Sequence, residues 1–368
     1  MEIDVRRIGD LAAEDLSAWR RLLDEGPCTV SPFVTPRFAE LVDRCRGGVR
    51  VGVLADAGRT VGFFPYQLRG ERHAVPVGWP MSDMQAVVVA PGYDWCPRAA
   101  LASCGLTTWE FDHLLMTGGV RPDIAFAVEP SPYIDLSGGF EAYRRARREA
   151  GSKKLKQIGR KARKMEREVG PLTFTLNDRD PEAFAKLAEW KSGKFRQTGV
   201  FDLFEWEWVP RLLRAVLDES SDELTGWLST LRCEGRLVAA DLGMRTGPTL
   251  ASWFTGYDTS LHEHGPGHIL SVRVAEAAAA AGVTRIDLGK GPEDYKWSFT
   301  DRFDEVAEGA VDLRPFATEL RRGFDGVTRK LKRSAWADRV RQPVRRLKAI
   351  RRSWERLPGT DLSSPGVG

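Results

Sequence analysis

The sequence has few cysteines, no long apolar run and no recognisable export signal. Its five cysteines form no C-x-x-C pair, and their odd number does not suit a disulfide framework. No apolar run approaches the roughly 18 residues that a transmembrane helix needs. The first residues, MEIDVRRIGDLAAEDL, lack the basic and then apolar order of a signal peptide. We therefore expect a cytoplasmic protein with reduced thiols.

Three common catalytic motifs are also absent. The sequence contains no G-x-x-x-x-G-K-[ST] phosphate loop, no G-x-S-x-G nucleophile elbow and no H-E-x-x-H zinc motif. Three of the five histidines, His262, His264 and His268, form an H-x-H-x3-H pattern. No cysteine lies near them and glycines spread them around a turn, so we predict no metal site.

The composition is that of a globular protein, and the charge is unevenly distributed. Hydrophobic residues make up 42% and charged residues 29% of the 368 positions, enough for two or more domains. Residues 144–167 contain 12 Lys or Arg against 2 Asp or Glu, and residues 321–352 contain 13 against 2. These basic segments could contact acidic surfaces of the protein itself, a phosphate-rich ligand, a membrane or a nucleic acid.

Apolar patterning predicts an α/β fold in the first half. Residues 49–55 and 60–68 are the expected strands of a hairpin that turns at Asp56-Ala57-Gly58. Short strands are expected at 86–89 and 134–136. Residues 140–169 are basic and predict one long helix, or two helices around Gly151, that joins the halves.

The second half contains a strand–helix–strand unit. Residues 249–257 and 283–288 are the expected strands and residues 266–281 the helix, so the strands should be parallel. The predicted organisation is an N-terminal domain (1–140), a basic helical connector (141–170), a C-terminal domain (171–315) and a basic helical tail (316–368).

The turn before this helix, HEHGPGH at residues 262–268, has the features of a phosphate-binding turn. The backbone N–H groups of Gly265, Gly267 and His268 can point at one spot, and the helix dipole adds positive charge there. A diphosphate is the natural ligand. The alternative is a tight turn that needs glycine only for its dihedral angles.

A second candidate site follows the last strand of the unit, in DLGKGPEDYKWSF at residues 287–299. Asp287 is placed at the carboxyl end of a buried strand, where parallel sheets bind ligands. Lys290 and Lys296 suit phosphate or a developing oxyanion, and Tyr295 can give a proton to a leaving thiolate. The alternative is that the aromatic residues pack and the lysines are solvated. The clustering after a strand–helix–strand unit favours a site.

A third patch is EWKSGKFRQTGVFDLF at residues 189–204. A helix places Trp190 and Lys194 near one face and Lys191 on the next. Alone, this patch fits an ordinary amphipathic helix.

Taken in order, these motifs resemble the cellulose-biosynthesis-type acetyltransferases of the GNAT superfamily. That family shows an aromatic–Asp pair, a small-Pro-Gly turn and a D-x-G-x-G-x-x-x-Y-K run, here Tyr257-Asp258, Gly265-Pro266-Gly267 and Asp287 through Lys296. The segments SPFVTPRFAELV (31–42) and GWPMSDM (78–84) are also similar to it, and the resemblance covers roughly residues 31–313. It implies two tandem GNAT-like domains, the first degenerate, with a central mixed sheet flanked by helices.

The resemblance also implies an activity and a set of site residues. The activity is transfer of an acyl group from acetyl-CoA or another acyl-CoA to an amine, as of an amino sugar or an amino-acid-like metabolite. The implied catalytic residues are Tyr295, Lys296, Asp287 and Asp258. The implied CoA-binding residues are His264, Gly265, Gly267, His268, Ile269 and Lys290. The implied acceptor-binding residues are Trp190, Lys191, Lys194, Trp253, Tyr257 and Glu293.

Two other functions remain open. Position 262 is His where the usual GNAT turn has Gln or Arg, which admits the related Fem-type transferases that use aminoacyl-tRNA. The basic residues 144–167 could bind tRNA phosphates, or could bridge two acidic domains. The third function is a non-catalytic nucleic-acid or membrane-surface protein, because the tail mixes basic residues with Trp336, Leu347 and Ile350 and could lie on anionic lipid.

Overall fold

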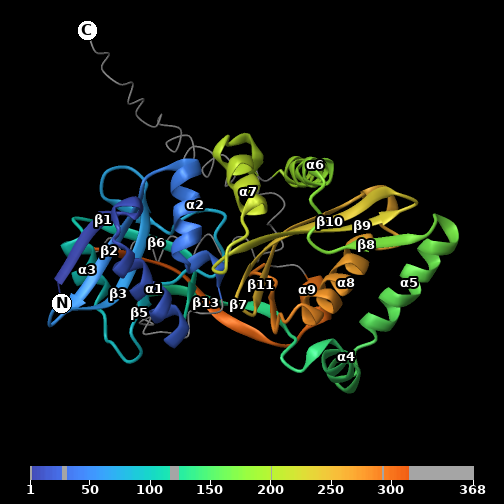
Figure 1. Ribbon diagram of the computed structural model, residues 1–368, viewed down its shortest axis with the longest axis horizontal. Helices are drawn as coiled ribbons and strands as arrows, with labels where there is room; N and C mark the ends of the chain where they lie inside the picture. Colours follow the sequence, from blue (N-terminus) through green and yellow to red (C-terminus); the bar gives the residue numbers. More distant parts are fainter. Residues whose placement is uncertain (1, 27–30, 117–123, 200, 292–293, 315–368) are drawn as a thin grey trace, which may run out of the picture.

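The computed structural model describes residues 2–26, 31–116, 124–199, 201–291 and 294–314 (Figure 1). Two predicted features lie outside these ranges, the basic tail from residue 316 and the proposed acceptor residue Glu293. Within them, no helix is both long and apolar enough to span a membrane.

The chain forms one mixed sheet that runs through both halves. Its strand order is β1-β2-β3-β4-β6-β13-β7-β12-β11-β10-β9-β8, and β5 pairs with β3. Two neighbouring pairs are parallel, β4 with β6 and β11 with β12, and the others are antiparallel. The first-half strands are β1 (Glu2–Arg7), β2 (Val49–Asp56), β3 (Arg59–Leu68), β4 (His73–Val75), β5 (Val88–Val89), β6 (Thr108–Leu115) and β7 (Ala125–Asp135). The second-half strands are β8 (Leu172–Thr175), β9 (Thr225–Cys233), β10 (Arg236–Thr246), β11 (Thr249–Tyr257), β12 (Arg285–Asp287) and β13 (Phe303–Asp312).

Helices cover both faces of this sheet. They are α1 (Ala13–Glu25), α2 (Pro36–Arg46), α3 (Pro97–Ser103), α4 (Gly139–Glu149), α5 (Lys154–Glu168), α6 (Pro181–Thr198), α7 (Trp208–Asp218), α8 (Pro266–Ala280) and α9 (Asp294–Phe299). Figure 1 shows α6 and α7 on one side of strands β8–β11, and α4, α5 and α8 on the other. The predicted class, an α/β fold with a large mixed sheet flanked by helices, is confirmed.

Two core clusters correspond to these two sides. One packs α1 and α2 of the first half together with α6, α7 and one face of β10 and β11. The other packs α4, α5 and α8 against the opposite face, including Ile134 of β7 and Ile286 of β12. Adjacent strand residues point to opposite faces, so Arg285 and Asp287 point away from α8.

Local sequence explains most of the elements. The predicted hairpin is confirmed as β2 and β3, with Ala57 and Gly58 at positive φ in the turn. The basic connector forms two helices, because Gly151 adopts a φ of +78° between α4 and α5. The first turn of α2 begins with Pro36, and the Thr35 side chain caps it by accepting from the Phe38 N–H.

The strand predictions at 86–89 and 134–136 had the wrong lengths. Only Val88–Val89 forms a strand in the first segment, whereas β7 is much longer than predicted and begins at Ala125. Pro130 and Pro132 hid β7, since proline is rare within strands. Here they are paired with Glu305 and Phe303 of β13, a strand far away in the sequence.

Candidate active site

The site lies where β11 and β12 part. Thr249 to Ala251 pair with Arg285 to Asp287 in parallel, as the sequence predicts for this unit. Beyond Asp287 strand β12 ends, while β11 continues to Tyr257 and pairs there with β10. The outer part of β11 and the described residues 288–291 and 294–296 therefore border the place where the two strands part.

The N-terminus of α8 faces this place. Gly265 is its N-cap, in the left-handed conformation with φ of 64°. Gly267 lies in the first turn, where backbone N–H groups have no intrahelical acceptor. The His268 N–H, which the sequence places in the phosphate site, donates instead to the Gly265 carbonyl at 3.0 Å. A Cβ on Gly267 would lie 3.0 Å from the ring of Tyr257, so the turn and this aromatic residue are in close contact.

Two lysines of α5 also lie at this turn, and the sequence analysis did not single them out. The Lys161 ammonium is 3.6 Å from the position that a Cβ on Gly265 would occupy. Burial, and then the charges of Lys154 and Lys161, lower the pKa of His268 to about 4. His268 is thus neutral at pH 7, and the two lysines supply the positive charge beside the α8 N-terminus.

The other predicted CoA-site residues differ in their surroundings. Tyr295 is exposed, and its ring lies 5.9 Å from that of His268. His264 pairs through Nε2 with Glu168 of α5 at 3.0 Å, so it joins α5 to the turn. Ile269 is buried in the core beneath α8 and packs there. Lys290 points toward the first half and donates to the Asp112 carbonyl at 2.5 Å.

Asp287 is buried, with 3% of its surface exposed. Its Oδ1 accepts from the Gly289 N–H at 2.9 Å, and its Oδ2 lies 3.5 Å from Arg285. Among the described residues, Oδ2 has no hydrogen-bond partner. Burial raises the pKa of Asp287 to about 6; Arg285 and the Gly289 N–H oppose the shift, and Asp83 and Asp304 add to it.

Lys296 is also buried and stabilises the loop after Asp287. Its ammonium donates to the carbonyls of Gly289 at 3.1 Å and Lys290 at 3.3 Å. Gly289 has a φ of +67°, which a residue with a side chain rarely adopts.

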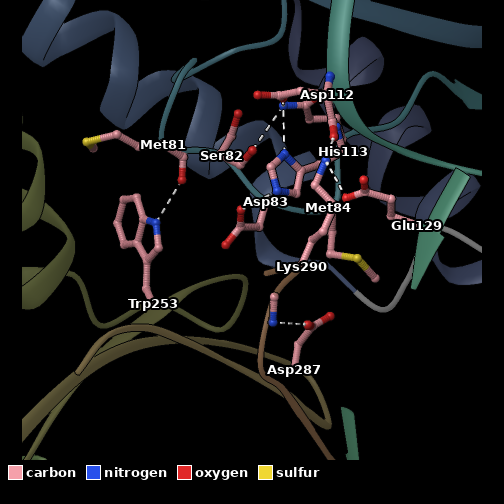
Figure 2. Close-up of polar contacts among 12 residues, drawn as sticks. Met81, Ser82, Asp83, Met84, Asp112, His113, Glu129, Trp253, Asp287 and Lys290 are labelled. Atoms are coloured by element: carbon pink, nitrogen blue, oxygen red, sulfur yellow. Dashed lines mark hydrogen bonds and ion pairs between the residues drawn. The ribbon is translucent and has the colours of Figure 1, made fainter. Parts of the chain in front are cut away.

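The first half contributes three titratable groups to the same place, Asp83, Asp112 and His113 (Figure 2). His113 Nε2 lies 3.2 Å from Asp83 Oδ1, and its Nδ1 lies 3.1 Å from Asp112 Oδ1. The other oxygen of Asp83, Oδ2, is 2.8 Å from the position of a Cβ on Gly289. Sequence reasoning noted the segment 78–84 but missed these groups, because no spacing rule links residue 83 to residue 113.

The charges in this cluster alter one another. Burial lowers the pKa of His113, but Asp112 and Asp83 outweigh this and raise it. Burial also raises the pKa of Asp83, against the opposing charges of His113 and Lys296. The two carboxylates therefore favour the protonated form of His113.

Asp258 is not brought into this cluster. Its carboxylate accepts from the N–H and hydroxyl of Ser260, where it caps a short 3₁₀ helix, and pairs with Arg236. It follows Ala251, the partner of Asp287, by seven residues, which is roughly 20 Å along an extended strand.

Three of the predicted acceptor residues lie on α6, whereas Tyr257 at the end of β11 contacts Gly267 of α8. Trp190 packs on Gly256, and the Lys191 ammonium lies 5.5 Å from the Phe254 ring, whereas Lys194 is exposed. Trp253 donates from its indole N–H to the Met81 carbonyl at 2.8 Å, which joins β11 to the first half. No group of three or more potential metal ligands occurs in the part of the chain that the structure describes.

Comparisons with known proteins place this geometry in a wider context. Residues 152–297 match the family model of the acetyltransferase (GNAT) domain. No curated protein sequence matches the chain. Three solved structures share its fold at low identity: FemX, L-PGS from Bacillus licheniformis, and a conserved protein of unknown function from Bacteroides thetaiotaomicron VPI-5482.

These structural similarities extend over both halves. FemX has a TM-score of 0.52 at 11% identity, covering 84% of this chain and 97% of FemX. L-PGS has a TM-score of 0.50 at 12% identity, covering 88% of this chain and 98% of L-PGS. The Bacteroides protein has a TM-score of 0.51 at 13% identity, covering 85% of this chain and 100% of that protein. The residues that match the GNAT acetyltransferase family model include α5, α8, β12 and most of α9.

Proposed function

We propose that this protein transfers an acyl group, with acetyl as the first choice, from acyl-CoA to the amine of a small molecule such as an amino sugar or an amino-acid-like metabolite. The observation that carries the proposal is the α8 N-terminus. There a left-handed Gly265 is the N-cap, Gly267 lies in the first turn, and the Lys161 ammonium is 3.6 Å from the Cβ position of Gly265. Backbone N–H groups, a helix dipole and lysines together suit a diphosphate such as that of CoA.

The remaining residues then take definite roles. With the diphosphate at α8, the thioester would lie where β11 and β12 part, close to Asp287 and residues 288–291. Tyr295, exposed beside His268, would give a proton to the departing thiolate. Lys296 donates to two carbonyls of the loop, so we assign it to holding the loop in place.

The test is isothermal titration with acetyl-CoA and with desulfo-CoA, comparing wild type with Gly267→Val. The new side chain would meet the Tyr257 ring and the space that a diphosphate needs. Gly193→Ala is the matched control, because that helical glycine has open space around its Cβ position. We expect micromolar binding that Gly267→Val weakens more than tenfold and that Gly193→Ala leaves unchanged. Wild-type protein that binds neither compound would refute the acyl-CoA donor.

A second donor, aminoacyl-tRNA, is favoured by one observation. Helices α4 and α5 and the link between them expose seven cations: Arg144, Arg145, Arg148, Lys153, Lys156, Arg160 and Arg163. Such cations can contact a phosphate backbone. Activity that survives ribonuclease treatment would exclude this donor.

The role of the tail at a membrane surface stays a prediction, since its residues lie outside the described part. Liposome flotation with and without the residues after Pro315 tests it. Equal flotation of the two proteins would exclude the role.

A further inference from the structure

The cluster between the halves brings four carboxylates and four cations close together. Asp83, Asp112 and Glu129 come from the first half and Asp287 from the second, and the nearby cations are His113, Lys290, Lys296 and Arg285. Lys290 and Lys296 donate hydrogen bonds to backbone carbonyls. Arg285 stacks on the Tyr133 ring, pairs with Asp304 and lies 3.5 Å from Asp287 Oδ2.

Two of these carboxylates lie on either side of one glycine. Asp287 Oδ1 accepts from the Gly289 N–H at 2.9 Å, and Asp83 Oδ2 lies 2.8 Å from the position that a Cβ on Gly289 would occupy. Asp287 Oδ2 is buried and has no hydrogen-bond partner among the described residues. A buried carboxylate oxygen without a donor is costly, so its presence here indicates a place for a cationic or hydrogen-bond-donating ligand.

We propose that Asp83 and Asp287 bind the ammonium group of the acceptor, and that Asp83 accepts its proton while His113 and Asp112 hold Asp83 in position. The proposal rests on the proposed function and deepens it: the acceptor carries a primary amine that is charged when it binds. The first half then supplies a catalytic residue, Asp83, and two positioning residues.

The step balances as follows. An N–H bond of the ammonium breaks and its proton passes to Asp83 Oδ2, which leaves a neutral amine with a free electron pair. The nitrogen attacks the thioester carbonyl, a C–N bond forms and the C–S bond breaks. Tyr295 protonates the departing sulfur, a second N–H bond breaks as the amide forms, and that proton restores the Tyr295 hydroxyl through solvent. Asp83 returns its proton to solvent, so one proton is released per amide formed.

Geometry supports Asp83 as the proton acceptor. Its side chain is 30% exposed, so it can exchange protons with water, whereas Asp287 is buried. His113 binds Oδ1 and leaves Oδ2 on the side of Gly289. Burial raises the pKa of Asp83, which makes it a better proton acceptor than an ordinary carboxylate.

The experiment measures CoA release from acetyl-CoA with two panels of probes. One panel holds the amines glucosamine, ethanolamine and lysine, and the other holds glucose, ethylene glycol and 2-hydroxy acids. Wild type, Asp83→Asn, His113→Gln and Glu110→Gln are compared, and acetyl-CoA binding is measured for each. Glu110 is the control because it forms a carboxylate–imidazole pair with His73 at 3.2 Å on the same strand, β6, as Asp112 and His113.

We expect transfer to at least one amine and to none of the alcohols. Asp83→Asn should lower kcat/KM for that amine about 10²-fold or more, with acetyl-CoA binding unchanged. His113→Gln should lower it less and shift the acidic limb of the pH profile upward, since the imidazolium lowers the pKa of Asp83. Other charged groups also influence the two carboxylates. Asp112, Lys290 and Lys296 lie around Asp83, and Arg285 and Asp304 lie around Asp287. Glu110→Gln should behave as wild type.

Three results would overturn the inference while leaving the acyl-CoA donor intact. They are acetylation of alcohols alone, Asp83→Asn activity within twofold of wild type, or acetyl-CoA binding with no probe accepted. A His113→Gln variant that loses activity without moving the pH profile would show that His113 is only structural. Wild-type protein that does not bind acetyl-CoA would instead refute the proposed donor.

Discussion

Lys161 gives the sharpest test of the donor site. Its ammonium lies 3.6 Å from the Cβ position of Gly265, at the place where we put the diphosphate. Two unit charges about 4 Å apart attract by about 1 kcal/mol in water and by about 4 kcal/mol at an effective dielectric constant near 20. Lys161 is exposed, so the value should lie near the lower limit. We expect Lys161→Gln to weaken acetyl-CoA binding about five- to tenfold.

The control is Lys156→Gln on the same helix. Lys154 and Lys161 are seven residues apart and share the face of α5 that meets α8, whereas Lys156 is exposed on another face. Both substitutions remove one charge from α5. Isothermal titration at about 50 mM and about 200 mM salt should show a loss for Lys161→Gln that shrinks with salt, because ions screen exposed charges. Lys156→Gln should stay within twofold of wild type.

Two results would refute this reasoning. If both variants lost the same affinity for acetyl-CoA, the total positive charge of α5 would matter and the position of Lys161 would not. No loss from a Lys154→Gln/Lys161→Gln double variant would place the phosphates elsewhere.

Three further predictions concern stability. Asp312→Asn should lower the free energy of unfolding in urea by about 2–3 kcal/mol, because a fully buried carboxylate loses its charged bonds to Arg314. Burial raises the pKa of Asp312, but those bonds outweigh this and lower it to about 2, so wild-type stability should fall as pH drops from about 4 through about 2. His268 has a folded pKa of about 4, so protonation of the unfolded chain should cost stability between about pH 6.5 and 4, and His268→Gln should remove that slope in a pH series of thermal melts. Trp19→Ala should cost about 3–5 kcal/mol in urea unfolding, because this fully buried ring stacks on Phe63 at 5.0 Å.

Local signals in the sequence were enough to predict the strand–helix–strand unit of β11, α8 and β12. Its strands are short apolar runs, its helix has Pro266 in the first turn, and Gly282 follows its end at a φ of +83°. Each signal acts within a few residues, so periodicity and turn chemistry suffice. The Gly-Pro-Gly turn and Asp287 were found for the same reason.

Pairing between distant segments was not predictable in this way. Strand β13 pairs with β6 and β7 of the first half, and no local pattern specifies such partners. The same limit hid Lys161 and His113, because each reaches its site through packing of separate elements. Asp258 illustrates the converse: the family resemblance implied a catalytic role for it, whereas its carboxylate bonds to Ser260 and Arg236 in the structure.

The charges on the two faces of β12 argue that the first half takes part in the reaction. Ile286 faces α8, where Lys154 and Lys161 make the surroundings positive, and Asp287 faces the other side, where the carboxylate of Asp83 also lies. An anionic donor and a cationic acceptor would therefore approach the end of β12 from opposite faces and meet where β11 and β12 part. If the first half only supported the fold, apolar side chains at position 83 would serve better, because a partly buried carboxylate pair costs stability unless a ligand uses it. The lysines on the α8 side, where we put the donor, lie within residues 152–297. Asp83 and His113, on the side where we put the acceptor, lie outside that range.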